Sequence, residues 1–205
     1  LKTMGGRSSG PEPLKNLLSF TRERMLACQG RRLKSIDAHD IICKIGETVV
    51  AGGVRRSALL SLSDLDDTGM REAKNGQFYL THPERSMANN SVAYSEKPTM
   101  PQFLDEWINL AKAGSGERGI FNRGSLKEQF PTRRWKIFEP DAQTSGTNPC
   151  GEIILKSKEF CNLSEVVARA DDTVDTLMDK VRVASILGTY QATLTNFPYL
   201  SEEWK

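Results

Sequence analysis

The sequence is poor in the residues that build metal sites and disulfide frameworks. Its 205 residues include four cysteines, at positions 28, 43, 150 and 161, and two histidines, His39 and His82. The cysteines are too sparse for a disulfide scaffold, which is typical of a reducing compartment. They also form no CxxC pair, so we expect no metal site. His39 and Cys43 lie four positions apart, the spacing of neighbours on a helix, but no third ligand lies near them.

The chain also lacks an excess of charge and a long apolar segment. Lys and Arg total 28 against 26 Asp and Glu, a formal net charge of +2, which argues against binding of nucleic acid through bulk charge. No apolar run reaches the roughly 18 residues of a membrane span, and the N-terminus has no signal-peptide pattern. With 38% hydrophobic and 26% charged residues, the composition predicts a soluble, globular, cytoplasmic protein without a nucleic-acid or membrane partner.

Apolar periodicity predicts alternating helices and strands. Short apolar runs near positions 58, 92, 119 and 153 predict strands, and most of them are separated by helical patterns, which indicates an α/β fold with a mainly parallel sheet. Segment 123–143 has no assignment. The expected helices are 11–29, 37–50, 67–74, one that opens at Thr99 and Pro101, and 172–194. The apolar stripes expected to face the core include Ile41, Ile42, Ile45 and Val49 of the second helix, and Phe103, Leu104, Trp107 and Leu110 of the fourth.

The most informative stretch runs from Ser145 to Glu152, small residues around one cysteine. If the segment is extended, the alternation of side chains places Asn148, Cys150 and Glu152 on one side. Pro149 fixes its own φ and Gly151 is free to take φ values closed to other residues, so the cysteine is expected at the tip of a tight loop.

The chemistry of this stretch leaves several roles open for the thiol: nucleophile, metal ligand or hydrogen-atom donor. Glu152 is able to move a proton and Asn148 to hydrogen-bond substrate hydroxyls. A carboxylate beside Cys150 disfavours the thiolate, which points away from nucleophilic hydrolysis. The other interpretation is a loop with a buried structural cysteine.

A second cysteine, Cys161, follows Cys150 by eleven positions in the run GTNPCGEIILKSKEFCNLSE. This run closely resembles the active-site finger loop of ribonucleotide reductases, especially the adenosylcobalamin-dependent (class II) ribonucleoside-triphosphate reductases, in which NPCGE or NPCSE is followed at this spacing by CNL. The resemblance implies a thiyl radical on Cys150, proton transfer by Glu152 and binding of ribose hydroxyls by Asn148. It also implies that Cys161 is one half of the dithiol oxidised during reduction.

The resemblance extends to three other polar segments. Gly5–Pro11 and Gly52–Ser57 are glycine-rich turns that by themselves fit an anion site or an ordinary loop, and the asparagine pair before the second strand usually marks only a turn. The family uses similar segments as two loops for the allosteric specificity nucleotide and as an NNS segment that faces the substrate. The implied effector-binding residues are Arg7, Ser9, Arg55 and Arg56, and the implied substrate-binding residues are Asn89, Asn90 and Ser91.

As a whole, the resemblance covers essentially all 205 residues and implies part of a ten-stranded α/β barrel, with an effector-loop region at about 1–62 and a central finger loop at about 144–162. Because the chain begins with Leu1 and stops soon after a helical pattern, we expect a single partial catalytic domain, a fragment. The implied cofactor is adenosylcobalamin, and the implied partners are a ribonucleoside triphosphate substrate, a dNTP effector and a thioredoxin-type reductant. The implied activity is the thiyl-radical reduction of ribonucleoside triphosphates to deoxyribonucleotides for DNA synthesis.

Two alternatives remain beside this interpretation. One is the large subunit of an iron-dependent class I ribonucleoside-diphosphate reductase, although NPCGE and CNLSEV fit the cobalamin enzymes better. The other is a non-catalytic deoxynucleotide-binding module with a vestigial cysteine loop. Neither Cys28 nor Cys43 matches the family's partner for Cys161, so we expect the isolated fragment to be inactive.

Overall fold

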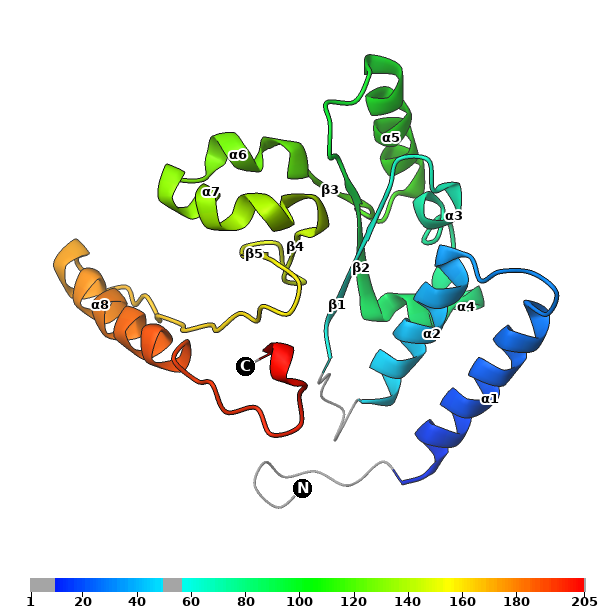
Figure 1. Ribbon diagram of the computed structural model, residues 1–205, viewed down its shortest axis with the longest axis horizontal. Coiled ribbons are helices and arrows are strands. Elements are labelled where there is room, and N and C mark those ends of the chain that lie inside the picture. Colours follow the sequence, from blue (N-terminus) through cyan, green and yellow to red (C-terminus); the bar gives the residue numbers. More distant parts are fainter. Residues whose placement is uncertain (1–9, 50–56, 205) are drawn as a thin grey trace.

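The computed structural model describes residues 10–49 and 57–204 (Figure 1). The predicted effector residues Arg7, Ser9, Arg55 and Arg56 lie outside the described residues. The elements are α1 (Glu12–Ala27), α2 (Ser35–Thr48), β1 (Leu59–Ser63), α3 (Thr68–Arg71), α4 (Phe78–Thr81), η1 (Pro83–Met87), β2 (Ala88–Ala93), α5 (Met100–Ala113), β3 (Gly119–Phe121), η2 (Arg123–Ser125), α6 (Leu126–Gln129), α7 (Thr132–Phe138), η3 (Glu139–Thr144), β4 (Gly146–Thr147), β5 (Ile154–Leu155), α8 (Val174–Gln191) and η4 (Glu202–Trp204).

A three-stranded parallel sheet in the order β1-β2-β3 forms the centre of the structure. Each crossover carries helical segments, α3, α4 and η1 before β2 and α5 before β3, as parallel pairing requires. The expected α/β arrangement is confirmed. The fourth strand expected near 153 does not join this sheet: β5 pairs antiparallel with β4, because the chain turns back between them.

Helix α5 begins and ends where its sequence predicts, but it buries a different face. Thr99 and Gln102 form a capping box at its start, and Gly114, at φ 65°, ends it. Leu104 and Trp107 of the expected core stripe are about half exposed, whereas Glu106 is fully buried. The prediction that this stripe forms the core is therefore wrong.

Helix α2 departs from its expected packing in the same way. Ile42 and Ile45 are about half exposed, while Asp40 and Cys43 are buried. Asp40 sits in the interior because Arg85 donates two hydrogen bonds to its carboxylate, at 2.6 and 2.8 Å. This pair ties α2 to η1.

The cluster of buried apolar side chains lies in segment 123–143, which had no assignment from apolar periodicity. Leu126, Phe138 and Ala142 are buried together, in α6, α7 and η3. Side chains packed against them include Phe121 at the end of β3 and Ile154 in β5. The core therefore connects the parallel sheet to the small β4-β5 sheet.

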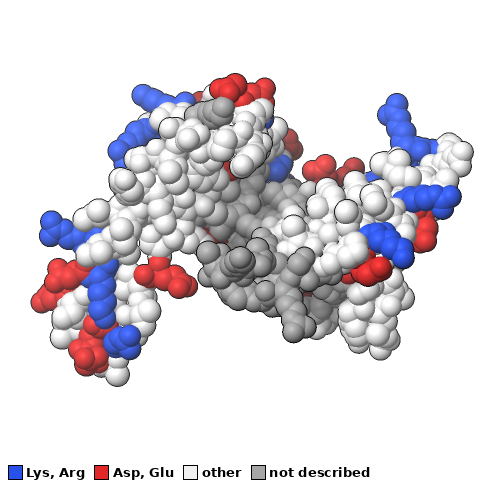
Figure 2. Space-filling model, turned by 90° about the horizontal axis from the view of Figure 1, so that it is seen from below, with Lys and Arg blue, Asp and Glu red and all other residues white. Residues whose placement is uncertain are grey.

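Helix α8 forms as expected and lies away from the parallel sheet, at the left of Figure 1. Thr173 caps its N-terminus and none of its residues is buried. Figure 2 shows the molecule from below, with charged side chains of both signs toward each side of the view. Within residues 10–49 and 57–204, no helix has the length and hydropathy for crossing a membrane.

Candidate functional site

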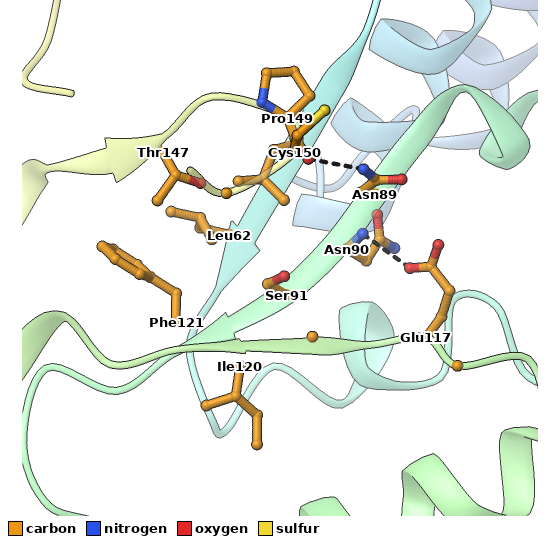
Figure 3. A pocket seen from close by; sticks show the side chains of 14 residues that line it. Leu62, Asn89, Asn90, Ser91, Glu117, Ile120, Phe121, Thr147, Pro149 and Cys150 are labelled. Carbon is orange, nitrogen blue, oxygen red and sulfur yellow. Dashed lines mark hydrogen bonds between the residues drawn. The ribbon is translucent and has the colours of Figure 1, made fainter. Parts of the chain in front are cut away.

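A pocket of about 380 Å³ lies where the face of the parallel sheet meets the turn that carries Cys150 (Figure 3). All three strands contribute to its wall, and the turn between β4 and β5 closes one side. The side chains that give it chemical character are Asn89, Ser91, Glu117, Phe121, Thr147 and Cys150.

The turn around Cys150 is closed by Asn148. The Asn148 N–H donates to Ile153 O at 3.1 Å, and its Oδ1 accepts from the Ile153 N–H at 3.0 Å. The Gly151 N–H donates to Asn148 O at 3.0 Å, and Gly151 has a φ of 88° that favours glycine. The tight loop predicted from Pro149 and Gly151 is confirmed, but the segment is not extended.

This geometry separates the three side chains that an extended strand would align. Asn148 is only 4% exposed, and its side-chain oxygen is used by the main chain of the turn. Cys150 is exposed and lines the pocket, whereas Glu152 is exposed and lies outside the pocket lining. The predicted alignment of Asn148, Cys150 and Glu152 on one side therefore fails, because the backbone turns at Pro149.

The asparagine pair lies inside β2, not before it, and its two side chains point to opposite faces. Asn89 Nδ2 donates to Pro149 O of the cysteine turn at 2.8 Å. Asn90 Oδ1 lies 3.0 Å from His39 Nε2, on α2. All three predicted substrate-binding residues line the pocket, and the side-chain oxygen of Asn90 is engaged by His39.

Two charged residues near the pocket had no role assigned from the sequence. Glu117 lines the pocket and accepts the Asn90 N–H at 3.0 Å. Its other carboxylate oxygen pairs with Lys74 Nζ at 2.8 Å. Lys74 is 5% exposed and also donates to Ala88 O. The signal for Glu117 was its place just before the strand at 119, whereas no local pattern marks Lys74.

Behind β2, His39 lies in a charged environment. Burial by itself lowers the pKa of His39, but the hydrogen bonds with Asp40, Cys43 and Asn90 outweigh it and raise the pKa to about 9. The Cys43 Sγ lies 3.6 Å from His39 Nε2, so the two residues at helical spacing are indeed neighbours. They have no third ligand between them among the described residues.

Within residues 10–49 and 57–204, one set of side chains has the spacing of metal ligands: Asp40, His82 and Glu84. Arginine side chains already occupy this position. Arg24 Nη2 lies 2.9 Å from Asp40 Oδ2, and Arg85 Nε lies 2.6 Å from Oδ1. Burial favours the protonated acid, but the hydrogen bonds from Arg85 lower the pKa of Asp40 to about 2. The cluster is therefore an ion-pair network that joins α1, α2 and η1.

The cysteines of the chain occupy different environments. Cys28 and Cys43 are buried, Cys161 is half-buried, Cys150 is exposed, and all four are free thiols. Cys161 does not line the pocket. It follows β5 in a stretch without helix or strand.

Among the comparisons with known proteins, the search of curated proteins finds relatives that share one name. No family model matches, and no solved structure matches. Over 164 residues the chain is 42% identical to the adenosylcobalamin-dependent ribonucleoside-triphosphate reductase of Lacticaseibacillus paracasei, covering 79% of this chain and 21% of that protein. Over 195 residues it is 37% identical to the reductase of the same name from Lactobacillus delbrueckii subsp. bulgaricus, covering 95% of this chain and 25% of that protein.

Over most of its length the chain is similar to adenosylcobalamin-dependent ribonucleoside-triphosphate reductases. A third relative with the same name, from Lactobacillus leichmannii, is 36% identical over 195 residues. The chain spans about a quarter or less of the length of these relatives. The resemblance found in the NPCGE and CNL motifs is therefore confirmed at the level of the family.

Proposed function

We propose that this chain supplies part of the catalytic barrel of an adenosylcobalamin-dependent ribonucleoside-triphosphate reductase. The proposed reaction converts ribonucleoside triphosphates to 2′-deoxyribonucleoside triphosphates for DNA precursor synthesis. The observation that carries the proposal is the position of Cys150, at the tip of a closed turn over a pocket whose wall is a parallel sheet. The name of these relatives supports the reaction and the cofactor.

The pocket suits hydrogen-atom transfer between a thiol and a bound sugar. A reactive group gains most when its partner is held within reach in a fixed geometry. In the proposed first step, the sulfur radical of Cys150 takes the 3′ hydrogen atom of the ribose, so an S–H bond forms as a C–H bond breaks. Asn89 and Ser91 supply polar groups on the pocket wall for the sugar hydroxyls.

The remaining residues of the turn take roles around this step. Glu152, two positions after Cys150 and exposed, is proposed to accept the proton of the 3′-OH. Asn148 does not line the pocket, and its side-chain oxygen holds the turn. Its side-chain NH₂ is therefore the group proposed for a ribose hydroxyl. As the 2′-OH leaves as water, a dithiol that includes Cys161 supplies two electrons and becomes a disulfide. A thioredoxin-type protein would then reduce this disulfide.

The exposure of the Cys150 thiol is compatible with adenosylcobalamin as the radical source. Because Cys150 is accessible from outside the sheet, an external radical source is able to reach its sulfur. When bound, adenosylcobalamin would supply the radical chemistry, and the Cys150 thiol would lose its hydrogen atom. Cys150 is the residue of this chain that would face it.

The wider organisation belongs to the same proposal. The three parallel strands would be part of a ten-stranded α/β barrel, with residues 144–162 as its central loop and residues 1–205 as one partial catalytic domain. A dNTP effector would bind near residues 1–62, with Arg7, Ser9, Arg55 and Arg56 as contacts. We expect residues 1–205 alone to be inactive, because a partner thiol for Cys161 is missing.

The test is anaerobic reduction of each ribonucleoside triphosphate by the full-length protein with a dithiol, with and without adenosylcobalamin. We expect deoxynucleotide only with the cofactor, no product from Cys150→Ala, and retained activity in Cys28→Ser, a buried thiol outside the pocket. Reduction by Cys150→Ala would refute the radical site. Reduction that needs a separate radical-generating subunit would favour the class I enzyme, and nucleotide binding without reduction would favour a binding module.

A further inference from the structure

The contacts of the cysteine turn point to Asn89 as more than part of the pocket wall. Its Nδ2 donates to Pro149 O at 2.8 Å. Pro149 immediately precedes Cys150, so this bond fixes the peptide that carries the thiol. No other hydrogen bond between described residues joins the turn at 148–153 to strands β1, β2 or β3.

The main chain on both sides of Asn89 is itself held. Lys74 donates to Ala88 O, and Glu117 accepts the Asn90 N–H at 3.0 Å. Lys74 and Glu117 also pair with each other at 2.8 Å. The flanking peptides are thus fixed by one ion pair, which leaves little freedom in the direction of the Asn89 side chain.

The neighbouring side chain adds a second restraint. Asn90, 3% exposed, has its Oδ1 3.0 Å from His39 Nε2 on the opposite face of the strand. Because successive side chains of a strand point to opposite faces, this contact holds Asn89 toward the cysteine turn. Figure 3 shows Asn89 directed at Pro149, with Cys150 beside it.

We propose that Asn89 is a positioning residue that anchors the Cys150 turn to the sheet and sets where the sulfur lies over the pocket. This inference rests on the proposed function, because its consequence for the rate assumes that Cys150 reacts with the substrate. Anchoring the turn requires the side-chain N–H of Asn89, because Pro149 O is an acceptor. Binding a substrate hydroxyl does not require it, because a hydroxyl also donates to an acceptor oxygen. That difference separates the two roles.

Two variants use this difference. Asn89→Ala removes the side-chain amide, and Asn89→Asp keeps the size and the acceptor oxygens but is unable, when ionised, to donate to Pro149 O. Since displacing a reacting group by about 1 Å costs on the order of 100-fold in rate, we expect kcat to fall roughly 10- to 100-fold in both variants. For Asn89→Asp, KM should stay within about threefold, because an acceptor for a substrate hydroxyl is retained. The control is Asn75→Ala, an exposed asparagine with one side-chain bond, to Asn109, outside the pocket.

A second readout follows the turn without catalysis. A trifluoromethyl label on Cys150, assigned by its absence in Cys150→Ala, reports the position and mobility of the turn by fluorine NMR. We expect a shifted or broadened signal in both Asn89 variants and an unchanged one in Asn75→Ala. An increase of KM at unchanged kcat, or wild-type kcat in Asn89→Asp, would overturn the anchor. If the unaltered protein reduces no nucleotide, the proposed function fails, and an unchanged fluorine signal in both variants would then overturn the anchor independently.

Discussion

Replacing Glu106 tests whether α5 is held by charge instead of by its apolar stripe. The Glu106 side chain is fully buried and shared by two arginines: Arg118 at 3.0 Å to each carboxylate oxygen, and Arg71 at 2.7 Å. Arg118 is also nearly buried, with a side chain 2% exposed, whereas that of Arg71 is 23% exposed. Glu106→Ala would leave the Arg118 charge buried without its carboxylate, and breaking such a pair costs about 3–5 kcal/mol.

Arg71 adds less to this cost, because water screens it in part. We therefore expect Glu106→Ala to lower the free energy of unfolding of the full-length protein by about 3–5 kcal/mol. Replacing both Glu106 and Arg118 with leucine should cost less than the alanine variant, since only the partly exposed Arg71 is then left without its carboxylate.

The assay is urea denaturation followed by circular dichroism, which yields the midpoint and slope of each variant. Asp105→Ala is the matched control, one position earlier on the same helix, where the carboxylate is exposed. It should stay within about 0.5 kcal/mol of the unaltered protein. If Glu106→Ala behaves like this control, or if the double leucine variant is less stable than the alanine variant, the reasoning is refuted.

Three further predictions concern the sheet and its surroundings. Gly124→Ala places a Cβ 2.6 Å from the backbone oxygen of Ser95, so its stability in urea should fall by about 1–3 kcal/mol. Lys74→Met leaves Glu117 without its buried cation, which should cost about 2 kcal/mol in the same assay. Because the pKa of His39 is raised from 6.5 to about 9, its stabilisation is complete below pH 6.5 and is lost as pH rises through 9, a decline of about 3 kcal/mol measurable by urea titrations at several pH values.

Each of these has its own control. Gly69→Ala, whose nearest neighbour would be 3.5 Å away, should be nearly neutral, and equal losses at both glycines would contradict the steric argument. Lys97→Met removes an exposed lysine and should leave stability unchanged. His39→Gln should flatten the pH profile between 6.5 and 9, and a decline of the same size in that variant would assign it to another group.

The sequence predicted the long helices α1, α2, α5 and α8 well but missed α4, α6 and α7, and it predicted the buried faces poorly. Capping residues and periodicity are local, so the start of α5 at Thr99 could be read directly. Burial of Glu106 depends on Arg71 and Arg118, 35 and 12 positions away, and no local pattern reports such a pairing. Asp40 in α2 is a similar case, since its partner Arg85 is 45 positions away. An apolar stripe was therefore taken for the core although charged residues fill that place.

At the candidate site, the alternation of side chains predicts their directions correctly only where the backbone is extended. Alternation of side chains was assumed for residues 148–152, where the chain turns and Asn148 binds the main chain instead. It was not applied to residues 89–91, where the chain is a strand. Applied there, it separates Asn89, which faces Cys150, from Asn90, which faces His39. The residue types at the site were thus readable from the sequence, whereas their directions depended on which of two short segments is extended.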